Sequence, residues 1–130
     1  MIIVDDKLSL DALAGRLGTS EPVATTWSFH FRLLRALRES GWGHLQRVAT
    51  EVTLPIAADP PGDRLRILDP RDVTDLASEF AVRHRLNLLA AELVASAVHY
   101  RAILHLDAAN VGRHWPEVMT AERVRLEVHG

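Results

Sequence analysis

Two aspartates, Asp5 and Asp107, are the clearest candidates for chemistry in this sequence. Each follows a short apolar run, residues 2–4 before Asp5 and residues 103–106 before Asp107. Short, continuously apolar runs are typical of buried parallel strands, whose carboxyl ends share one edge of the sheet. Open α/β folds place their ligands at that edge. Because Mg²⁺ and Mn²⁺ prefer oxygen ligands, the pair predicts a divalent-cation site formed by Asp5 and Asp107.

The apolar pattern predicts the elements that must position these aspartates. Strands are expected at residues 2–4, 65–68, 103–106 and 124–128. Helices are expected over residues 10–17, 24–40, 70–84 and 87–100, with a shorter helix at residues 45–52 and a proline-rich linker at residues 55–62. A turn at Asn110 and Gly112 leads into the last strand, which alternates apolar and charged residues as an edge strand does. We expect a single α/β domain over residues 1–130, a three-layer α/β/α sandwich around a mostly parallel sheet.

Composition excludes several classes of protein without naming a function. The chain has 130 residues, a net charge of −2 and no cysteine, so disulfides and thiolate metal sites are excluded. No apolar run approaches the roughly 18 residues that a membrane span requires, and a cytoplasmic protein is expected. The sequence lacks the Gly-x-Ser-x-Gly, Walker and Gly-x-Gly-x-x-Gly motifs, which argues against triad hydrolases, nucleoside triphosphatases and dinucleotide enzymes.

The chain resembles the PIN-domain family, the fold of the VapC toxins of bacterial toxin–antitoxin pairs. The matching segments are the strands that end in the two aspartates, the alanine-rich helix with the segment before it, and the closing strand: residues 1–5, 80–86, 93–97, 104–107 and 124–128. The resemblance implies a PIN-like endoribonuclease whose carboxylates hold Mg²⁺ or Mn²⁺, with the metal activating water. It also implies an RNA substrate, an antitoxin-like partner and a homodimer.

The acidic site that the resemblance implies is incomplete in this sequence. The family's glutamate on the second helix falls near Arg32, and the aspartate that opens the alanine-rich helix falls at Ala91. Glu92 is adjacent to Ala91 but points about 100° away around the helix. The family's hydroxyl or amide residue, two positions after the first aspartate, falls at Lys7.

Only Asp5 and Asp107 match the family residue by residue, with Asp6 adjacent to the first of them. Clustered carboxylates repel one another unless a cation neutralises them. Lys7 and Arg32 would supply fixed positive charge where a metal would sit, and one of them should then contact Asp5 or Asp107. The alternative is that the two aspartates are unrelated turn or helix-cap residues.

Three arginines, Arg32, Arg35 and Arg38, make the second helix basic. They could contact an RNA backbone, since arginine and lysine supply phosphate contacts. The other interpretation is a solvated helix face, because no aromatic residue is interleaved among the exposed positions.

The apolar arc of the same helix carries Trp27, Phe29 and Phe31 and is wider than one sheet face covers. We therefore expect this helix to contribute to a symmetric homodimer. Two functions remain open from the sequence. One is a VapC-type ribonuclease whose activity is weak or lost. The other is a non-catalytic PIN-like module that dimerises or binds a protein partner.

Overall fold

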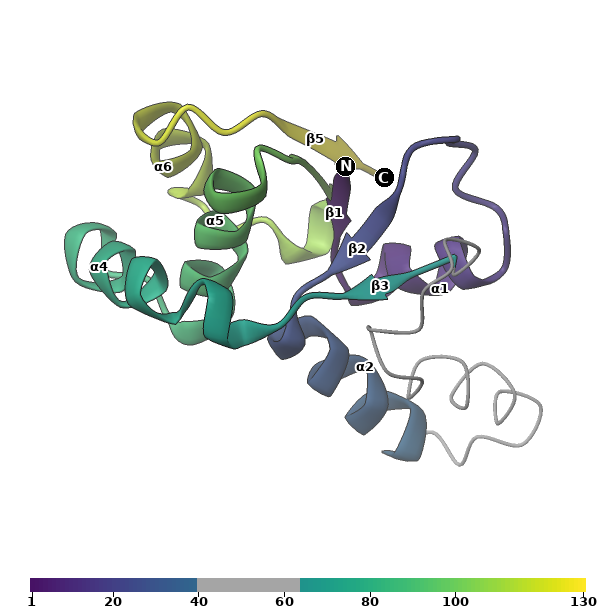
Figure 1. Cartoon of the computed structure of the whole chain (residues 1–130). Helices are drawn as coiled ribbons and strands as arrows, with labels where there is room; N and C mark the ends of the chain where they lie inside the picture. The colour runs from purple at the N-terminus through teal and green to yellow at the C-terminus, as the bar shows by residue number, and fades with distance from the viewer. Residues whose placement is uncertain (40–63) are drawn as a thin grey trace.

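The computed structural model describes residues 1–39 and 64–130 (Figure 1). In this part of the chain, five strands form one parallel sheet of order β3-β2-β1-β4-β5: β1 (Ile2–Val4), β2 (Val23–Thr25), β3 (Arg66–Ile67), β4 (Ile103–Asp107) and β5 (Leu126–His129). The α-helices are α1 (Asp6–Leu13), α2 (Trp27–Glu39), α4 (Thr74–His84), α5 (Leu88–Tyr100) and α6 (Trp115–Ala121). Two 3₁₀ helices are η2 (Pro70–Asp72) and η3 (Ala108–Asn110). The helix predicted at residues 45–52 and the linker at residues 55–62 lie outside the described residues.

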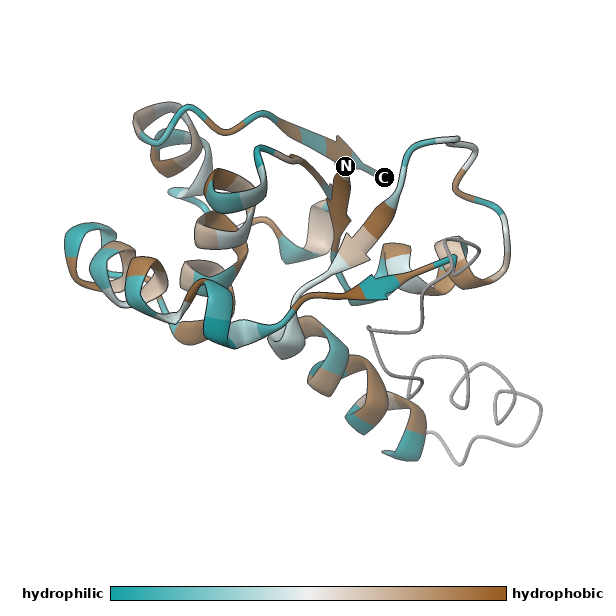
Figure 2. Cartoon of the chain, in the orientation of Figure 1, coloured by the Kyte–Doolittle hydropathy of each residue, from teal (hydrophilic) through white to brown (hydrophobic). Residues whose placement is uncertain are grey.

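Helices cover both faces of the sheet. Ile3 packs with Leu104 and Leu106 of β4 against α4, α5 and α6. Ile2 and Val4 face the other side and pack on α1, as alternation along a strand requires. Figure 2 shows the apolar strand β1 lying between these helices. The three-layer α/β/α fold is confirmed, and the described sheet is entirely parallel rather than mostly so.

The alanine-rich helix α5 packs directly on the sheet. It begins after Asn87, whose side chain accepts a hydrogen bond from the backbone N–H of Ala90. Its residues 90–97 are all buried, and most of them belong to the same hydrophobic core as Ile3, Leu104 and Leu106 of the sheet. Helix α2 follows the carboxyl end of β2 and contacts both α1 and α5. No helix in the described ranges is long and apolar enough to cross a membrane.

The predicted second helix was too long at its start. Residues Val23–Thr25, which the sequence pattern assigned partly to that helix, form the three-residue strand β2 beside β1. The hydroxyl of Thr25 donates to the carbonyl of Val4 at 2.7 Å. The hydroxyl of Thr26 accepts from the backbone N–H of Phe29 at 3.3 Å, so the helix begins after Thr26. Side-chain oxygens of threonine commonly cap helices in this way.

The connection from β4 to β5 also differs from the prediction. Instead of a simple turn at Asn110 and Gly112, the chain forms η3 and then α6 before it reaches β5. The side chain of Trp115 at the start of α6 is 8% exposed. A Cβ atom at Gly112 would lie 2.4 Å from Trp115 Nε1, so only glycine admits the indole here. Strand β5 lies at the edge of the sheet, as predicted.

We expect Gly112→Ala to destabilise the protein by about 1–3 kcal/mol, the usual cost of overpacking a filled site. The added methyl group would overlap the indole of Trp115. Equilibrium urea unfolding measures the loss. In a Trp115→Leu background, where the indole is absent, the same substitution should cost much less. Equal costs in the two backgrounds would show that the indole contact is not the reason for glycine at this position.

Candidate functional site

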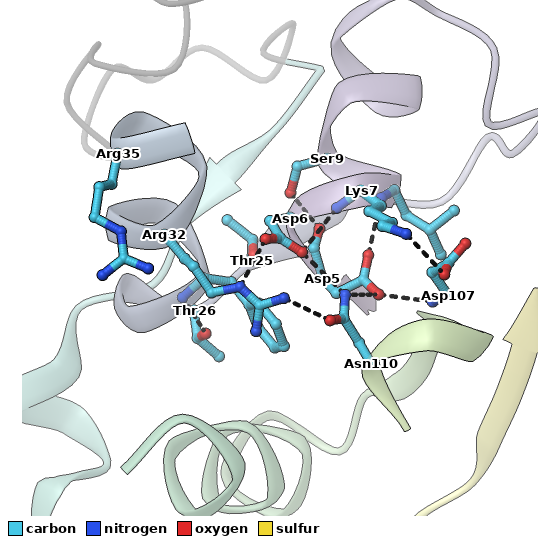
Figure 3. A network of polar contacts seen from close by, with 12 residues as sticks. Asp5, Asp6, Lys7, Ser9, Thr25, Thr26, Arg32, Arg35, Asp107 and Asn110 are labelled. Carbon is cyan, nitrogen blue, oxygen red and sulfur yellow. Dashed lines mark hydrogen bonds and ion pairs between the residues drawn. The ribbon is translucent and has the colours of Figure 1, made fainter. Parts of the chain in front are cut away.

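The structure brings Asp5 and Asp107 together at the carboxyl edge of the sheet. β1 and β4 are adjacent parallel strands, with Val4 in register with His105. The next residue after β1 is Asp5, and β4 ends at Asp107. The backbone N–H of Asp107 donates to Asp5 Oδ2 at 2.6 Å (Figure 3).

The carboxylate of Asp5 is fully buried and accepts three hydrogen bonds. Oδ1 accepts from the backbone N–H of Leu8 at 2.9 Å, which makes Asp5 the N-cap of α1. Oδ2 accepts from the backbone N–H of Asp107 and from Asn110 Nδ2, the latter at 2.9 Å. A buried carboxylate needs such donors, because it has lost its water.

Asp107 belongs to the polar cluster around Asp5 and is also the N-cap of η3. Its Oδ2 accepts from the backbone N–H of Ala109 at 2.9 Å and so caps η3. The two interpretations of the aspartates, a shared polar cluster and helix caps, therefore both describe the structure.

Two cationic side chains lie against this cluster. Lys7 Nζ lies 3.4 Å from Asp107 Oδ2, and Arg32 Nε lies 3.0 Å from Asp6 Oδ2. Lys7 thus makes the contact that the sequence predicted for a positive residue, whereas Arg32 contacts Asp6 rather than Asp5 or Asp107. Both ion pairs keep some solvent exposure, so each contributes on the order of 0–1 kcal/mol.

Asn110, which the sequence pattern predicted only as a turn residue, joins the two halves of the cluster. Its Nδ2 donates to Asp5 Oδ2 and to Asp6 Oδ1, and its Oδ1 accepts from Arg32 at 2.6 Å. The spacing held a signal for this role. In a 3₁₀ helix, residues three apart eclipse one another, so Asn110 returns to the edge where Asp107 lies.

Glu92, predicted to lie next to the site, points elsewhere. It is 5% exposed, and its carboxylate accepts from the backbone N–H of Ser28 at 3.0 Å and from the Ser28 hydroxyl at 3.1 Å. These contacts place a negative charge at the N-terminus of α2, where the helix dipole favours it. Ala91 belongs to the hydrophobic core beneath the sheet. The acid at position 92 therefore caps a helix and does not complete the cluster.

The remaining predicted arginines lie outside the cluster. Arg35 pairs with Glu39 one turn further along α2, at 3.7 Å between Nε and Oε1. Figure 3 shows Arg35 on the side of Arg32 that is remote from the aspartates. Arg38 is exposed.

The donor set fits a salt-bridged cluster better than a metal centre. A hard divalent cation needs carboxylate oxygens with free lone pairs. Both lone pairs of Asp5 Oδ2 are used by N–H donors, and Lys7 and Arg32 occupy positions beside Asp107 and Asp6. In the described part of the chain, no group of three or more His, Cys, Asp or Glu residues is arranged to hold a metal ion. The residues present therefore do not fit Mg²⁺ or Mn²⁺ in this arrangement.

Comparisons with known proteins bear on the fold. No protein-family model matches the chain, and no curated protein matches it. Among solved structures, the chain is similar to one in the "Toxin-antitoxin complex from Klebsiella pneumoniae", with a TM-score of 0.57 and 16% sequence identity. The match covers 81% of this chain and 84% of that one. The chain thus shares its α/β fold with a component of a toxin–antitoxin complex.

The carboxyl group of Asp107 has a pKa below its ordinary value. The largest cause is the backbone N–H of Ala109; desolvation opposes the shift, and the ammonium of Lys7 lowers the pKa further. The ionised form is therefore favoured by folding. Asp107 contributes stability above its unfolded pKa, and that contribution is lost as the pH falls through the lowered folded pKa.

We expect Lys7→Met to raise the pKa of Asp107 but to leave it below its ordinary value, because the Ala109 N–H remains. NMR titration of the Asp107 side-chain carboxyl carbon measures this shift. Arg35→Met, which removes a charge without touching Asp107, is the control and should leave the titration unchanged. A complete return to the ordinary pKa in Lys7→Met would mean that Lys7, and not the backbone donor, controls this carboxylate.

Proposed function

We propose that this chain is a single PIN-like domain of the VapC toxin type in which side-chain cations replace the metal centre. Metal-dependent RNA cleavage is then weak or lost. One observation carries the proposal: Lys7 and Arg32 pair with Asp107 and Asp6 at the edge that would hold a metal, and the buried Asp5 is saturated by N–H donors. The likeness in fold to a chain of a toxin–antitoxin complex supports the toxin-type assignment.

Chemistry at this edge supports the same conclusion. Metal-dependent hydrolysis of an RNA phosphodiester needs a cation that lowers the pKa of bound water and stabilises the charge of the phosphate. An ammonium and a guanidinium that are already paired with carboxylates do neither of these. A cation would have to displace Asn110 from Asp5 and break both ion pairs before it could bind.

We expect the wild-type protein to show almost no stabilisation by Mg²⁺ or Mn²⁺ and no metal-dependent cleavage of a mixed RNA substrate. A ligand at its Kd adds only about 0.4 kcal/mol to the stability, and a ligand that does not bind adds nothing. Thermal unfolding and gel analysis of the RNA measure the two quantities.

The matched variant is Lys7→Ser combined with Arg32→Glu, which gives these positions the residue types that the resemblance implies. Without metal it should be less stable than wild type, because its carboxylates repel one another. Mn²⁺ should restore part of that loss. A clear rise in the wild-type melting temperature with Mn²⁺, together with cleavage that Asp5→Asn abolishes, would overturn the proposal.

A second candidate function is a protein-interaction module, and the exposed aromatic residues of α2 favour it. Trp27 and Phe31 are 49% and 60% exposed, and they lie one helical turn apart on the same face. Phe29 is fully buried in the core, so the predicted contact face consists of two aromatics rather than three. We propose that this face pairs with a second copy of the chain, since symmetric dimers are the commonest assemblies.

Light scattering at tens of micromolar should then give about twice the chain mass of 14.5 kDa. Trp27→Ser combined with Phe31→Ser should give the monomer mass with unchanged circular dichroism. Val82→Ser, at an 84% exposed apolar position on α4, is the control and should leave the dimer intact. A wild-type mass of 14.5 kDa would contradict the dimer and leave a different protein as the occupant of this face.

A further inference from the structure

A second candidate site lies at the opposite, amino edge of the sheet. A cavity of about 300 Å³ is formed by the C-terminal end of α5, the start of β4 and the connection from α6 to β5. In Figure 1 these segments meet on the upper side of the molecule, near the chain's N-terminus, whereas α2 lies on the lower side. The apolar part of its lining includes Ala97, Val98, Ile103 and Val124. Its charged part is Arg101, Glu122, Arg123 and Arg125.

The cavity carries a surplus of positive charge. Arg101 and Arg123 are exposed, and no residue in the described ranges forms an ion pair with either of them. Arg125 pairs with Glu127 at 2.8 Å. The single acid in the lining, Glu122, pairs with residues of α4.

Glu122 is held by two residues of α4. Arg83 and His84 approach its Oε2 to 2.9 Å and 2.7 Å. Burial alone would raise the pKa of Glu122, but the hydrogen bonds from these two residues lower it overall. The carboxylate of Glu122 is therefore paired with residues of α4. The two unpaired arginines, Arg101 and Arg123, make the electrostatic potential in the cavity positive.

The backbone at these arginines is strained. Arg101 ends α5 with φ 53°, and Arg123 follows α6 with φ 59°. This left-handed conformation after a helix is usually occupied by glycine or asparagine, because other side chains crowd the backbone there. Both helix ends are closed by a backbone hydrogen bond, from Ala102 N–H to the Ala97 carbonyl and from Val124 N–H to the Met119 carbonyl, as is usual for this conformation.

Arg85 is a comparison residue, because it has the same helix-end conformation as Arg101 but lies outside the cavity. It ends α4 with φ 53° but does not line the cavity. A positive charge at a helix C-terminus favours arginine at both Arg85 and Arg101 through the helix dipole. The dipole does not explain why Arg101 and Arg123, from different segments, both line one cavity.

We propose that this cavity binds a small phosphomonoester of nucleotide size, with Arg101 and Arg123 holding the phosphate and the apolar lining covering the organic group. Guanidinium groups match phosphate oxygens through paired N–H donors. The volume is at the lower end of the range for small-molecule sites, which suits a nucleoside monophosphate better than a larger ligand. This site is separate from the acidic edge and does not depend on the function proposed for it.

Isothermal titration calorimetry at low ionic strength tests the proposal with three probes: adenosine 5′-monophosphate, inorganic phosphate and adenosine. The monophosphate should bind more tightly than phosphate, and adenosine should not bind. Arg101→Asn and Arg123→Asn should each weaken binding of the monophosphate by roughly tenfold or more, the effect of losing one charge-assisted contact. Arg85→Asn should bind as the wild type does.

Thermal unfolding shows whether the variants remain folded. Asparagine tolerates the left-handed conformation, so none of the three substitutions should lower the melting temperature by more than about 2 °C. Amide NMR shifts on adding the monophosphate should be confined to residues around Arg101 and Arg123 and should not reach Asp5.

Three results would overturn the proposal. The first is no binding of the monophosphate at millimolar concentration. The second is binding that Arg101→Asn and Arg123→Asn leave unchanged. The third is binding of an oligoribonucleotide without a terminal phosphate as tightly as the monophosphate binds. The ligand would then be an RNA backbone.

Discussion

The carboxyl edge of this protein depends on how the chain satisfies one buried charge, the carboxylate of Asp5. An unpaired carboxylate in the interior costs several kcal/mol, so its donors must be held firmly. They come from three separate segments: Leu8 in the first turn of α1, Asp107 at the end of β4 and Asn110 in η3. The carboxylate thereby fastens a helix, a strand and a turn to the end of β1. Asp107 and Asn110, which contact Lys7 and Arg32 respectively, are both held by this carboxylate.

Neutralisation by side chains differs physically from neutralisation by a metal ion. The charges of Lys7 and Arg32 are covalently attached, so they are present at any concentration of divalent cation. They also offer no exchangeable position for water or substrate, which is what makes a bound metal catalytic. The inner hydrogen bonds of Asp5 are shielded from solvent, whereas the outer ion pairs are partly exposed and screened by salt. Salt should therefore loosen the outer pairs before it affects the buried carboxylate.

The sequence predicted what depends on local pattern and missed what depends on distant contacts. Apolar runs and parallel pairing were enough to place Asp5 and Asp107 at one edge. Strand β2 was not predicted, because its three residues are too few to show a strand-like alternation of apolar and polar residues before the long helix α2. The role of Glu92 could not be predicted, and the spacing of Asn110 from Asp107 only indicated that it returns to the same edge, because the partners of both residues lie far away in the chain. Glu92 bonds to Ser28, 64 residues earlier, and Asn110 to Asp5, 105 residues earlier.

The two edges of the sheet differ in electrostatic character, and strand β4 connects them. It begins at Ile103 in the basic cavity and ends at Asp107 in the acidic cluster. At about 3.3 Å per residue, these five residues span roughly 13 Å. That length exceeds the screening distance of about 8 Å at physiological salt. The exposed charges of the two edges are therefore largely screened from one another. A mechanical connection also exists, because β4 runs from one edge to the other and the hydrogen bond from Asp107 fixes its end to Asp5.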